Sequence, residues 1–367
     1  MGKVQFAVKN LVNYELQKLS YAFNGNYARP TQLIISISNN CCLRCRMCGH
    51  WKSEYRPHDE LTTEEWKRVL LEFKDWIKDS FYIQFTGGEP FLRNDMLELL
   101  NFASTHGIKT LVNSNCFLID EDLAKRIASS GLNYLTISLD GVRPETFDAL
   151  RGVRGAHKRV TSGILNANRY KRMGMIVGIS SIVTDHNLDE LIPLVRWGEE
   201  NGIDRVGFHA LQPHFNYFQQ SKMPDPEWYK TSDLWVKDPE KSDRIIDKLI
   251  EKKAGGSPII NSTKHLLTMK RYYRDPYFAR DDSTCMVGVN NIRIECDGGV
   301  RLCNSMEKIG NVREAPVRDI WNSPPAKKRR LEIKACNRRC TAKCMYTQSL
   351  MEKAKLFLFL AKKRVLE

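Results

Sequence analysis

The sequence has no long apolar run: none of its 367 residues lies in a stretch approaching the roughly 20 apolar residues of a membrane-spanning helix. The N-terminus does not resemble a secretory signal, and no zinc-finger pattern or aromatic RNA-binding motif accompanies the net charge of +14. No internal repeat occurs beyond an alternation of strand-like and helix-like segments. We therefore expect neither a transmembrane protein, nor a secreted one, nor a nucleic-acid partner.

Acidic residues are fewer than basic ones, 43 against 57, and the eleven cysteines are an odd number. An odd count without a secretory signal argues against a disulfide framework and for a reducing compartment, which predicts a cytoplasmic protein. A hydrophobic content of 42% and a charged content of 27% are those of an ordinary globular protein. The length allows two domains.

Three cysteines follow the apolar segment 33–38 at C-x3-C-x2-C spacing: Cys41, Cys45 and Cys48. Iron-sulfur clusters are normally held by four cysteines, so the triad is either an incomplete site or one that leaves an iron open. A zinc site would need a fourth ligand, and Cys42 and His50 are both near in sequence. The triad alone leaves a cluster, zinc and inert thiols as alternatives.

Two further motifs follow in order, Gly87-Gly88-Glu89-Pro90 after one apolar stretch and Thr136-Ile137-Ser138 at the end of another. Together with the triad, they resemble the radical S-adenosylmethionine (SAM) superfamily over residues 31–215. The resemblance implies that the three cysteines hold a 4Fe-4S cluster, whose open iron is chelated by the amino and carboxylate groups of SAM. Met47 then occupies the apolar position of the cysteine motif.

The resemblance also implies how SAM is held. Gly87, Gly88, Glu89 and Pro90 would meet the SAM amino group, because glycines let a backbone approach a ligand and a carboxylate suits an ammonium group. Ser138 would meet the ribose or the carboxylate, and Arg151 is a further candidate for the carboxylate. The alternatives are a tight turn at the glycines and a solvated surface charge at Arg151.

Six apolar, β-branched runs alternate with helix-length segments, which predicts βα units and a parallel sheet. They are residues 33–38, 81–85, 109–112, 134–138, 176–183 and 205–208. A capping box at Thr62-Thr63-Glu64-Glu65 predicts the start of one helix. Six such units fit the partial (β/α)6 TIM-like barrel of the superfamily, an α/β fold with its chemistry at the carboxyl ends of the strands.

A second cysteine group near the C-terminus resembles the SPASM and Twitch extensions, which hold auxiliary 4Fe-4S clusters: Cys285, Cys303, Cys336, Cys340 and Cys344. Five cysteines favour one auxiliary cluster over two, held by the first two and by two of the last three, and the sequence does not decide which two. A zinc knuckle is the alternative, since thiolate ligands do not name their metal. We expect Cys42, Cys116 and Cys296 to be ordinary thiols. Cys116 is kept as an alternative candidate for catalysis, because it follows a strand end that faces the predicted site.

The predicted organisation has five parts: an N-terminal helical extension (1–30), the radical SAM core (31–215), a bridge (216–275), the auxiliary cluster domain (276–350) and a basic apolar tail (351–367). The bridge is rich in proline, with one helix expected near Ser242 to Lys253. The tail is either a helix docked on the core or a segment that contacts acidic lipid, and the second interpretation predicts a membrane-peripheral protein.

The resemblance implies reductive cleavage of SAM to a 5′-deoxyadenosyl radical, which abstracts hydrogen from an unactivated carbon. We expect peptide or protein modification by oxidation, cross-linking or epimerisation, and the alternative substrate is a lipid, a sugar or another small metabolite. A non-enzymatic zinc-binding adaptor is the alternative outside enzymes. His209 and Cys116 are the candidate catalytic residues, and the expected reductant is a flavodoxin or a ferredoxin.

Overall fold

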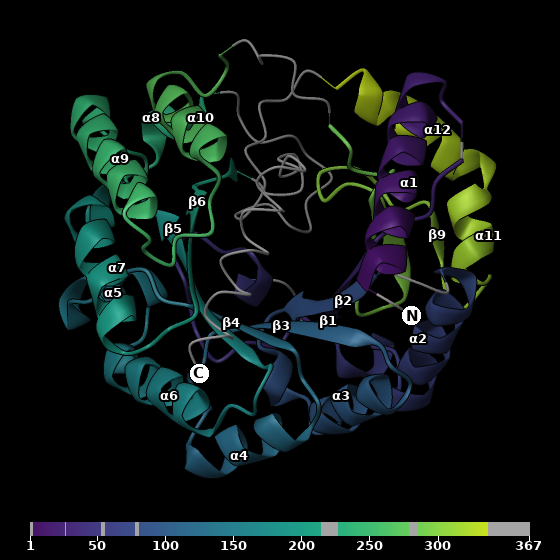
Figure 1. Cartoon of the computed structure of the whole chain (residues 1–367), viewed down its shortest axis with the longest axis horizontal. Coiled ribbons are helices and arrows are strands. Elements are labelled where there is room, and N and C mark those ends of the chain that lie inside the picture. The colour runs from purple at the N-terminus through teal and green to yellow at the C-terminus, as the bar shows by residue number, and fades with distance from the viewer. Residues whose placement is uncertain are drawn as a thin grey trace.

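The computed structural model describes residues 3–25, 27–52, 56–77, 81–213, 227–278 and 285–336, with side chains from residue 12 onward. Within these residues the strands form one nine-stranded sheet with the order β6-β5-β4-β3-β2-β1-β7-β8-β9. Figure 1 shows helices on the outer side of the strands. The predicted α/β class is confirmed.

Six parallel strands form the barrel wall, and each lies where the sequence predicts one. They are β1 (Gln32–Ser38), β2 (Tyr82–Gly87), β3 (Lys109–Ser114), β4 (Tyr134–Ser138), β5 (Ile176–Val183) and β6 (Arg205–Ala210). Neighbours pair in chain order, as Leu33 with Ile83 and Val112 with Leu135 show. Because all six strands are parallel, their carboxyl ends meet at one rim of the partial barrel.

Helices follow the strands and cover the outside of the wall. They are α2 (Thr63–Ile77), α3 (Met96–Thr105), α4 (Glu121–Ser129), α5 (Pro144–Arg151), α6 (Ala156–Tyr170) and α7 (Leu191–Glu200). The capping box of α2 is confirmed, because Thr62 and Glu65 exchange side chain–backbone hydrogen bonds of 2.8 and 3.3 Å. Helical spacing then turns the apolar face with Trp66 and Phe73 inward, where both are fully buried.

The C-terminal part continues the same sheet. β7 (Asn291–Ile294) pairs in parallel with β1, and β8 (Gly299–Arg301) and β9 (Gly310–Asn311) add antiparallel strands beyond it. A hairpin turn at Asp297-Gly298 joins β7 to β8, with Gly298 at φ +84°, where glycine is favoured. The edge of β1 is thus paired rather than exposed. The domain boundaries stay a prediction, since the sheet does not stop between the two parts.

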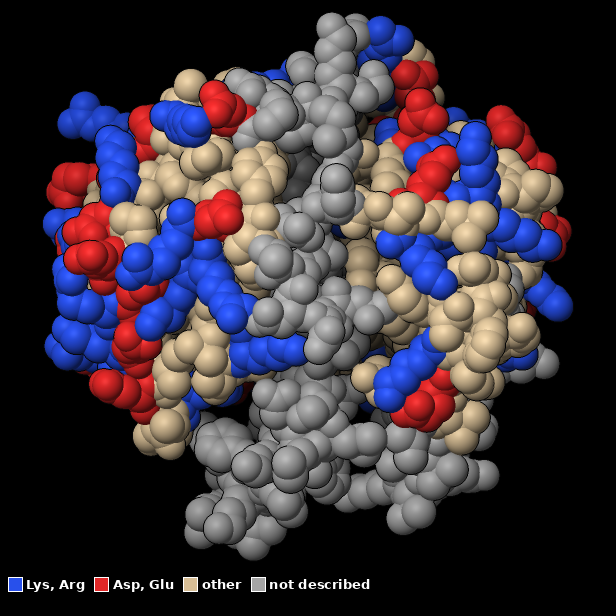
Figure 2. Space-filling model, turned by 90° about the horizontal axis from the view of Figure 1, so that it is seen from above, with Lys and Arg blue, Asp and Glu red and all other residues tan. Residues whose placement is uncertain are grey.

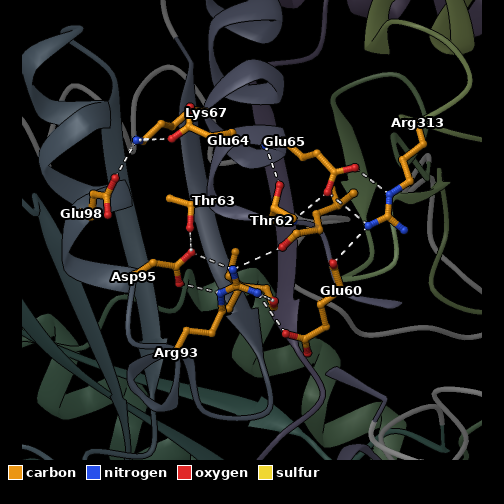
Figure 3. Close-up of polar contacts among 12 residues, drawn as sticks. Glu60, Thr62, Thr63, Glu64, Glu65, Lys67, Arg93, Asp95, Glu98 and Arg313 are labelled. Atoms are coloured by element: carbon orange, nitrogen blue, oxygen red, sulfur yellow. Dashed lines mark hydrogen bonds and ion pairs between the residues drawn. The ribbon is translucent and has the colours of Figure 1, made fainter. Parts of the chain in front are cut away.

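A polar network joins the start of α2 to both parts of the sheet (Figure 3). Arg93, three residues after Pro90, contacts Glu60 at 3.0 Å and Asp95 at 2.8 Å. Arg313, beyond β9, contacts Glu65 at 2.7 Å. Thr63, the first residue of α2, donates to Asp95 at 2.6 Å, so the first turn of α2 is held between the segment after β2 and the segment after β9.

Residues 227–278 pack against the far edge of the wall. They contain α8 (Trp228–Thr231), α9 (Pro239–Ala254) and α10 (Thr263–Arg274), and α9 confirms the helix predicted near Ser242 to Lys253. Asn261 bonds to both backbone groups of Phe208 in β6, at 2.8 and 2.7 Å, and Tyr273 donates to the Val183 carbonyl at 2.6 Å. This part of the predicted bridge therefore covers the edge of β6.

The N-terminal helix α1 (Lys3–Ala22) lies beside the C-terminal helices α11 (Val317–Asn322) and α12 (Pro324–Lys334) (Figure 1). Lys334, at the end of α12, donates to the carbonyls of Tyr21 and Ala22 at 3.0 and 3.1 Å. A cation at a helix carboxyl end is favoured by the helix dipole. No helix in the described ranges is long and apolar enough to cross a membrane, and the predicted tail, 351–367, lies outside those ranges.

Candidate functional site

The cysteine loop, residues 39–49, leaves the carboxyl end of β1 and is held by the end of α5. The backbone N–H groups of Arg44 and Arg46 donate to the carbonyls of Arg151 and Leu150, each at 3.0 Å. Gly152 follows at φ +68°, and a Cβ there would lie 2.4 Å from the Arg44 carbonyl oxygen. Glycine is therefore what lets α5 end so close to the loop.

Gly87 and Gly88 bring the end of β2 against the start of the same loop. A Cβ at Gly87 would lie 2.4 Å from the Ser38 carbonyl oxygen, and one at Gly88 would lie 2.0 Å from that of Asn40. The N–H groups of Gly88 and Glu89 donate to those two carbonyls at 2.7 Å each. These glycines are thus required by close contact between two backbone segments, a constraint that the sequence alone does not reveal.

The carboxylate of Glu89 is turned into the protein. It is 1% exposed and accepts hydrogen bonds from Ser114 Oγ at 2.8 Å and from the N–H groups of Asn115 and Phe91 at 2.7 and 3.2 Å. Burial raises the pKa of Glu89 to about 7 in spite of these donors. Nothing in this geometry supports a meeting of the carboxylate with an ammonium group, so contact between this segment and SAM is a prediction that rests on the backbone.

Arg151 is buried, which excludes a solvated surface charge. It is 6% exposed, its guanidinium contacts Asp140 at 2.6 Å, and Nη1 donates to Cys45 Sγ at 3.6 Å. Asp140 also accepts from the Ile182 N–H at 2.8 Å. The charge of Arg151 is thus paired and aimed at a triad sulfur. Its contact with the SAM carboxylate stays a prediction.

Asn115 is a second N–H donor at the triad. Its Nδ2 donates to Cys41 Sγ at 3.6 Å and to Cys42 Sγ at 3.4 Å. Hydrogen bonds to ligand sulfurs tune iron-sulfur clusters. The sequence analysis missed both Asn115 and Asp140. The available signal was their position, since each is polar and stands one or two residues beyond a strand end on the rim.

The triad fits a cluster with three protein ligands. Burial raises the pKa of the Cys48 thiol to about 12 and also raises that of Cys45, so thiolates here require a positive partner, which a bound metal centre provides. N–H donors already face two of the three sulfurs. In addition, Nε of Arg151 is buried without a hydrogen-bond partner in the described part of the chain, which suits a bound anionic group.

Other predicted SAM residues lie on the same rim. Ser138 ends β4, is partly exposed and makes no side-chain hydrogen bond within the described residues. Met47 is 1% exposed in the core, as its apolar position in the motif predicts. Pro90 begins a 3₁₀ turn, Pro90–Leu92, that carries the chain away from the loop.

The two predicted catalytic residues differ in placement. His209 lies in β6, half-buried, paired in register with Ile182 of β5. Cys116 is fully buried at φ +64°, and a Cβ on Gly163 of α6 would lie 2.8 Å from its sulfur. This thiol therefore faces the outer helices, and no contact supports a catalytic role. Burial also raises its pKa well above the usual value, as for an ordinary packed thiol.

The structure describes three of the five predicted auxiliary ligands, Cys285, Cys303 and Cys336, each partly buried, whereas Cys340 and Cys344 lie outside the described ranges. The choice among the last three cysteines stays open. Cys296, predicted as an ordinary thiol, is 7% exposed, and its carbonyl accepts the Leu61 N–H at 2.7 Å. The backbone of Cys296 thereby links the C-terminal module, residues 285–336, to the barrel.

Two family models match this arrangement. The model of the radical SAM superfamily matches residues 35–209, and that of the SPASM iron-sulfur cluster-binding domain matches residues 285–345. The protein belongs to the radical SAM superfamily. Its cofactors are SAM, a 4Fe-4S cluster and auxiliary iron-sulfur clusters in the SPASM domain. The chain is therefore an enzyme rather than a zinc-binding adaptor.

The radical SAM enzyme has relatives with different substrates. It is 28% identical to Fe-coproporphyrin III synthase of Methanosarcina barkeri, over 86% of this chain and 80% of that protein. It is also 28% identical to PqqA peptide cyclase of Bradyrhizobium diazoefficiens, over 50% of this chain and 47% of that protein. At the same identity, this chain is thus similar to one protein named for a tetrapyrrole product and to one named for a peptide substrate.

Among solved structures, Streptococcus suis SuiB bound to its precursor peptide SuiA has the same fold. The match has a TM-score of 0.63 at 20% identity and covers 88% of this chain and 71% of SuiB. The partial barrel with its C-terminal extension is therefore confirmed.

Proposed function

We propose that this radical SAM enzyme modifies a peptide or protein by oxidation, cross-linking or epimerisation. The observation that carries the proposal is that both kinds of comparison name peptide substrates. PqqA peptide cyclase is a sequence relative, and SuiB has the same fold and was solved with its precursor peptide.

The rim supplies the groups that such a reaction needs. In this proposal the triad holds the 4Fe-4S cluster, and the backbone of residues 87–90 together with Ser138 and Arg151 holds SAM. When bound, these cofactors supply the one-electron cleavage that yields the 5′-deoxyadenosyl radical. The chain fixes their position: Arg151 and Asn115 donate to the sulfurs, and Asp140 holds the Arg151 guanidinium in place.

The second cysteine group has a separate role in the proposal. Cys285, Cys303 and two of Cys336, Cys340 and Cys344 would hold an auxiliary cluster, which would supply either an acceptor for the electron left after hydrogen abstraction or a binding site for the peptide. His209, half-buried on the last strand of the wall, is the candidate residue for contact with the substrate.

A small tetrapyrrole is the second candidate substrate, because Fe-coproporphyrin III synthase is similar over a larger share of this chain than PqqA peptide cyclase, 86% against 50%. This candidate falls within the small-metabolite alternative.

The two candidates are separated by a substrate assay. Reconstituted protein is incubated anaerobically with SAM and dithionite, together with either short peptides encoded beside its gene or iron porphyrins from which Fe-coproporphyrin III can form. Mass spectrometry follows the substrate, and chromatography follows 5′-deoxyadenosine. A peptide mass change that matches the 5′-deoxyadenosine formed supports the proposal. Matched turnover of the porphyrin with unchanged peptides overturns it.

We also propose two partners. A flavodoxin or a ferredoxin delivers the electron, and the basic apolar tail, 351–367, contacts acidic lipid at a membrane surface. Co-sedimentation with anionic vesicles tests the tail, because deletion of the residues after Met351 should abolish it. Equal sedimentation of the full and shortened chains would contradict the lipid contact.

A further inference from the structure

The cysteine loop presents two kinds of side chain. Leu43, Cys45 and Met47 are buried, whereas Arg44 and Arg46, which alternate with them, are exposed. The loop thus turns its ligand side inward and shows cations to solvent. On the face seen in Figure 2, Lys and Arg are interspersed with Asp and Glu.

An indole joins these cations to the ligand residues. Trp51 Nε1 donates to the Cys45 carbonyl at 2.9 Å. The Arg44 guanidinium carbon lies 5.6 Å and Lys52 Nζ lies 5.4 Å from the centroid of the indole ring, which is within the range of cation–π attraction. Arg44 also donates to the Cys41 carbonyl at 2.7 Å. Two side chains of this outer face therefore bond directly to the backbone of triad cysteines.

Within the described residues, most of the positive charge of this face has no ion-pair partner. Arg46 is paired with Asp233. Arg44, Lys52 and Arg154, by contrast, are exposed and have no ion pair within the described residues. Arg154 stands two residues beyond Gly152, whose backbone packs against that of Arg44. Two cations, Arg44 and Lys52, thus flank the Trp51 indole, and a third, Arg154, follows the end of α5 that packs on the loop.

We infer that Arg44, Lys52, Arg154 and Trp51 form the docking surface for an acidic one-electron carrier protein. The inference rests on the proposed function, which needs an electron at the triad. In the transfer, the carrier loses one electron and the cluster gains one, with no bond formed and no proton moved. Because electron transfer slows steeply with distance, a surface bonded to the ligand backbone offers a short route. Complementary charge steers the encounter.

A charge reversal tests the surface without changing the residues that bond to the triad cysteines. The double variant Lys52→Glu with Arg154→Glu leaves Arg44 and Trp51 in place. The matched control is Lys248→Glu with Arg244→Glu on α9, one Lys and one Arg that are also exposed and have no ion pair within the described residues. Both variants are reconstituted and must carry the iron content of the unchanged protein.

Two measurements are made on each protein. Calorimetry gives the affinity for oxidised flavodoxin at low and at high salt. SAM cleavage is then driven either by reduced flavodoxin or by dithionite, a small reductant that needs no docking surface. We expect the surface variant to lose about tenfold or more in flavodoxin affinity at low salt and in flavodoxin-driven cleavage. Its dithionite-driven cleavage should be unchanged, and the control variant should match the unchanged protein.

The possible failures are distinguishable. Equal losses in the surface and control variants, or no loss in either, overturn the docking surface. An absence of dithionite-driven cleavage in the unchanged, iron-replete protein overturns radical generation at the triad, while the binding measurement still decides the docking surface.

Discussion

The two cysteine groups of this chain are built in different ways. The ligands of the triad lie within one short loop, which is packed against the ends of three other elements through Gly88, Asn115 and Arg151. The predicted ligands of the second group that the structure describes come from segments far apart in sequence, before β7, after β8 and after α12. The first site therefore depends on how the barrel rim packs. The second depends on how the C-terminal module folds to bring three distant segments of the chain together.

The two sites nevertheless share a sheet. β1 leads into the triad, and its other neighbour is β7 of the module. The Arg93 and Arg313 contacts fix both parts to the first turn of α2 (Figure 3). Changes at the triad and changes at the module should thus be separable in metal content but linked in stability.

The largest effect is expected from Cys45→Ala. This change should abolish SAM cleavage and lower the iron content from about eight to about four per chain, because one of two 4Fe-4S clusters is lost. Iron analysis and 5′-deoxyadenosine formation measure the two results. Cys296→Ala, at a buried thiol outside both predicted ligand sets, serves as the control and should keep both. Loss of nearly all iron in Cys45→Ala would show that the sites are not independent.

Arg151→Met should be the most destabilising change at the rim. It leaves the Asp140 carboxylate buried and unpaired, and breaking a buried ion pair in this way costs about 3–5 kcal/mol of unfolding free energy. Denaturant unfolding of the metal-free protein measures the cost. The double variant Arg151→Met with Asp140→Leu should recover part of it, since no charge is then left buried. A cost below about 1 kcal/mol would mean that the pair is solvated.

Gly88→Ala should act on the loop through packing. The added Cβ would lie 2.0 Å from the Asn40 carbonyl oxygen, so one backbone segment must shift, at a cost of about 1–3 kcal/mol. Iron at the triad should fall while auxiliary iron is kept. Gly107→Ala, at a glycine with φ +70° and no neighbouring atom within 4 Å, is the control for backbone strain alone. Equal iron loss in both variants would rule out the packing explanation.

The smallest effect is expected at the contact between module and barrel. The hydrogen bond from Arg313 lowers the pKa of Glu65 from 4.5 to about 2. Because the folded-state pKa is the lower one, this contact stabilises the fold above pH 4.5, and its contribution is lost as the pH falls toward 2. Arg313→Gln should lower stability at neutral pH by less than about 1 kcal/mol and flatten the acid dependence.

Thermal unfolding between pH 2 and pH 7 measures this difference, with Arg318→Gln on α11 as the surface control. A pH profile of Arg313→Gln identical to that of the unchanged protein would contradict the contact.

The comparison of the two sites also explains what the sequence could predict. Strands, the α2 capping box and the triad are local patterns, so their positions follow from neighbouring residues. The destination of a side chain depends on packing between distant segments. For that reason the inward turn of Glu89, the burial of Arg151 with Asp140 and the outward-facing sulfur of Cys116 were not predictable. The pairing of β7 with β1 likewise joins segments that are distant in the chain.

The most direct test of the account is whether SAM binds at the triad alone. Electron paramagnetic resonance of the reduced clusters is recorded with and without SAM in two variants, one without the triad ligand (Cys45→Ala) and one without two auxiliary ligands (Cys285→Ala with Cys303→Ala). We predict that SAM changes the spectrum of the second variant and leaves that of the first unchanged. A SAM-dependent change in Cys45→Ala, or none in the auxiliary variant, would contradict the assignment of SAM to Cys41, Cys45 and Cys48.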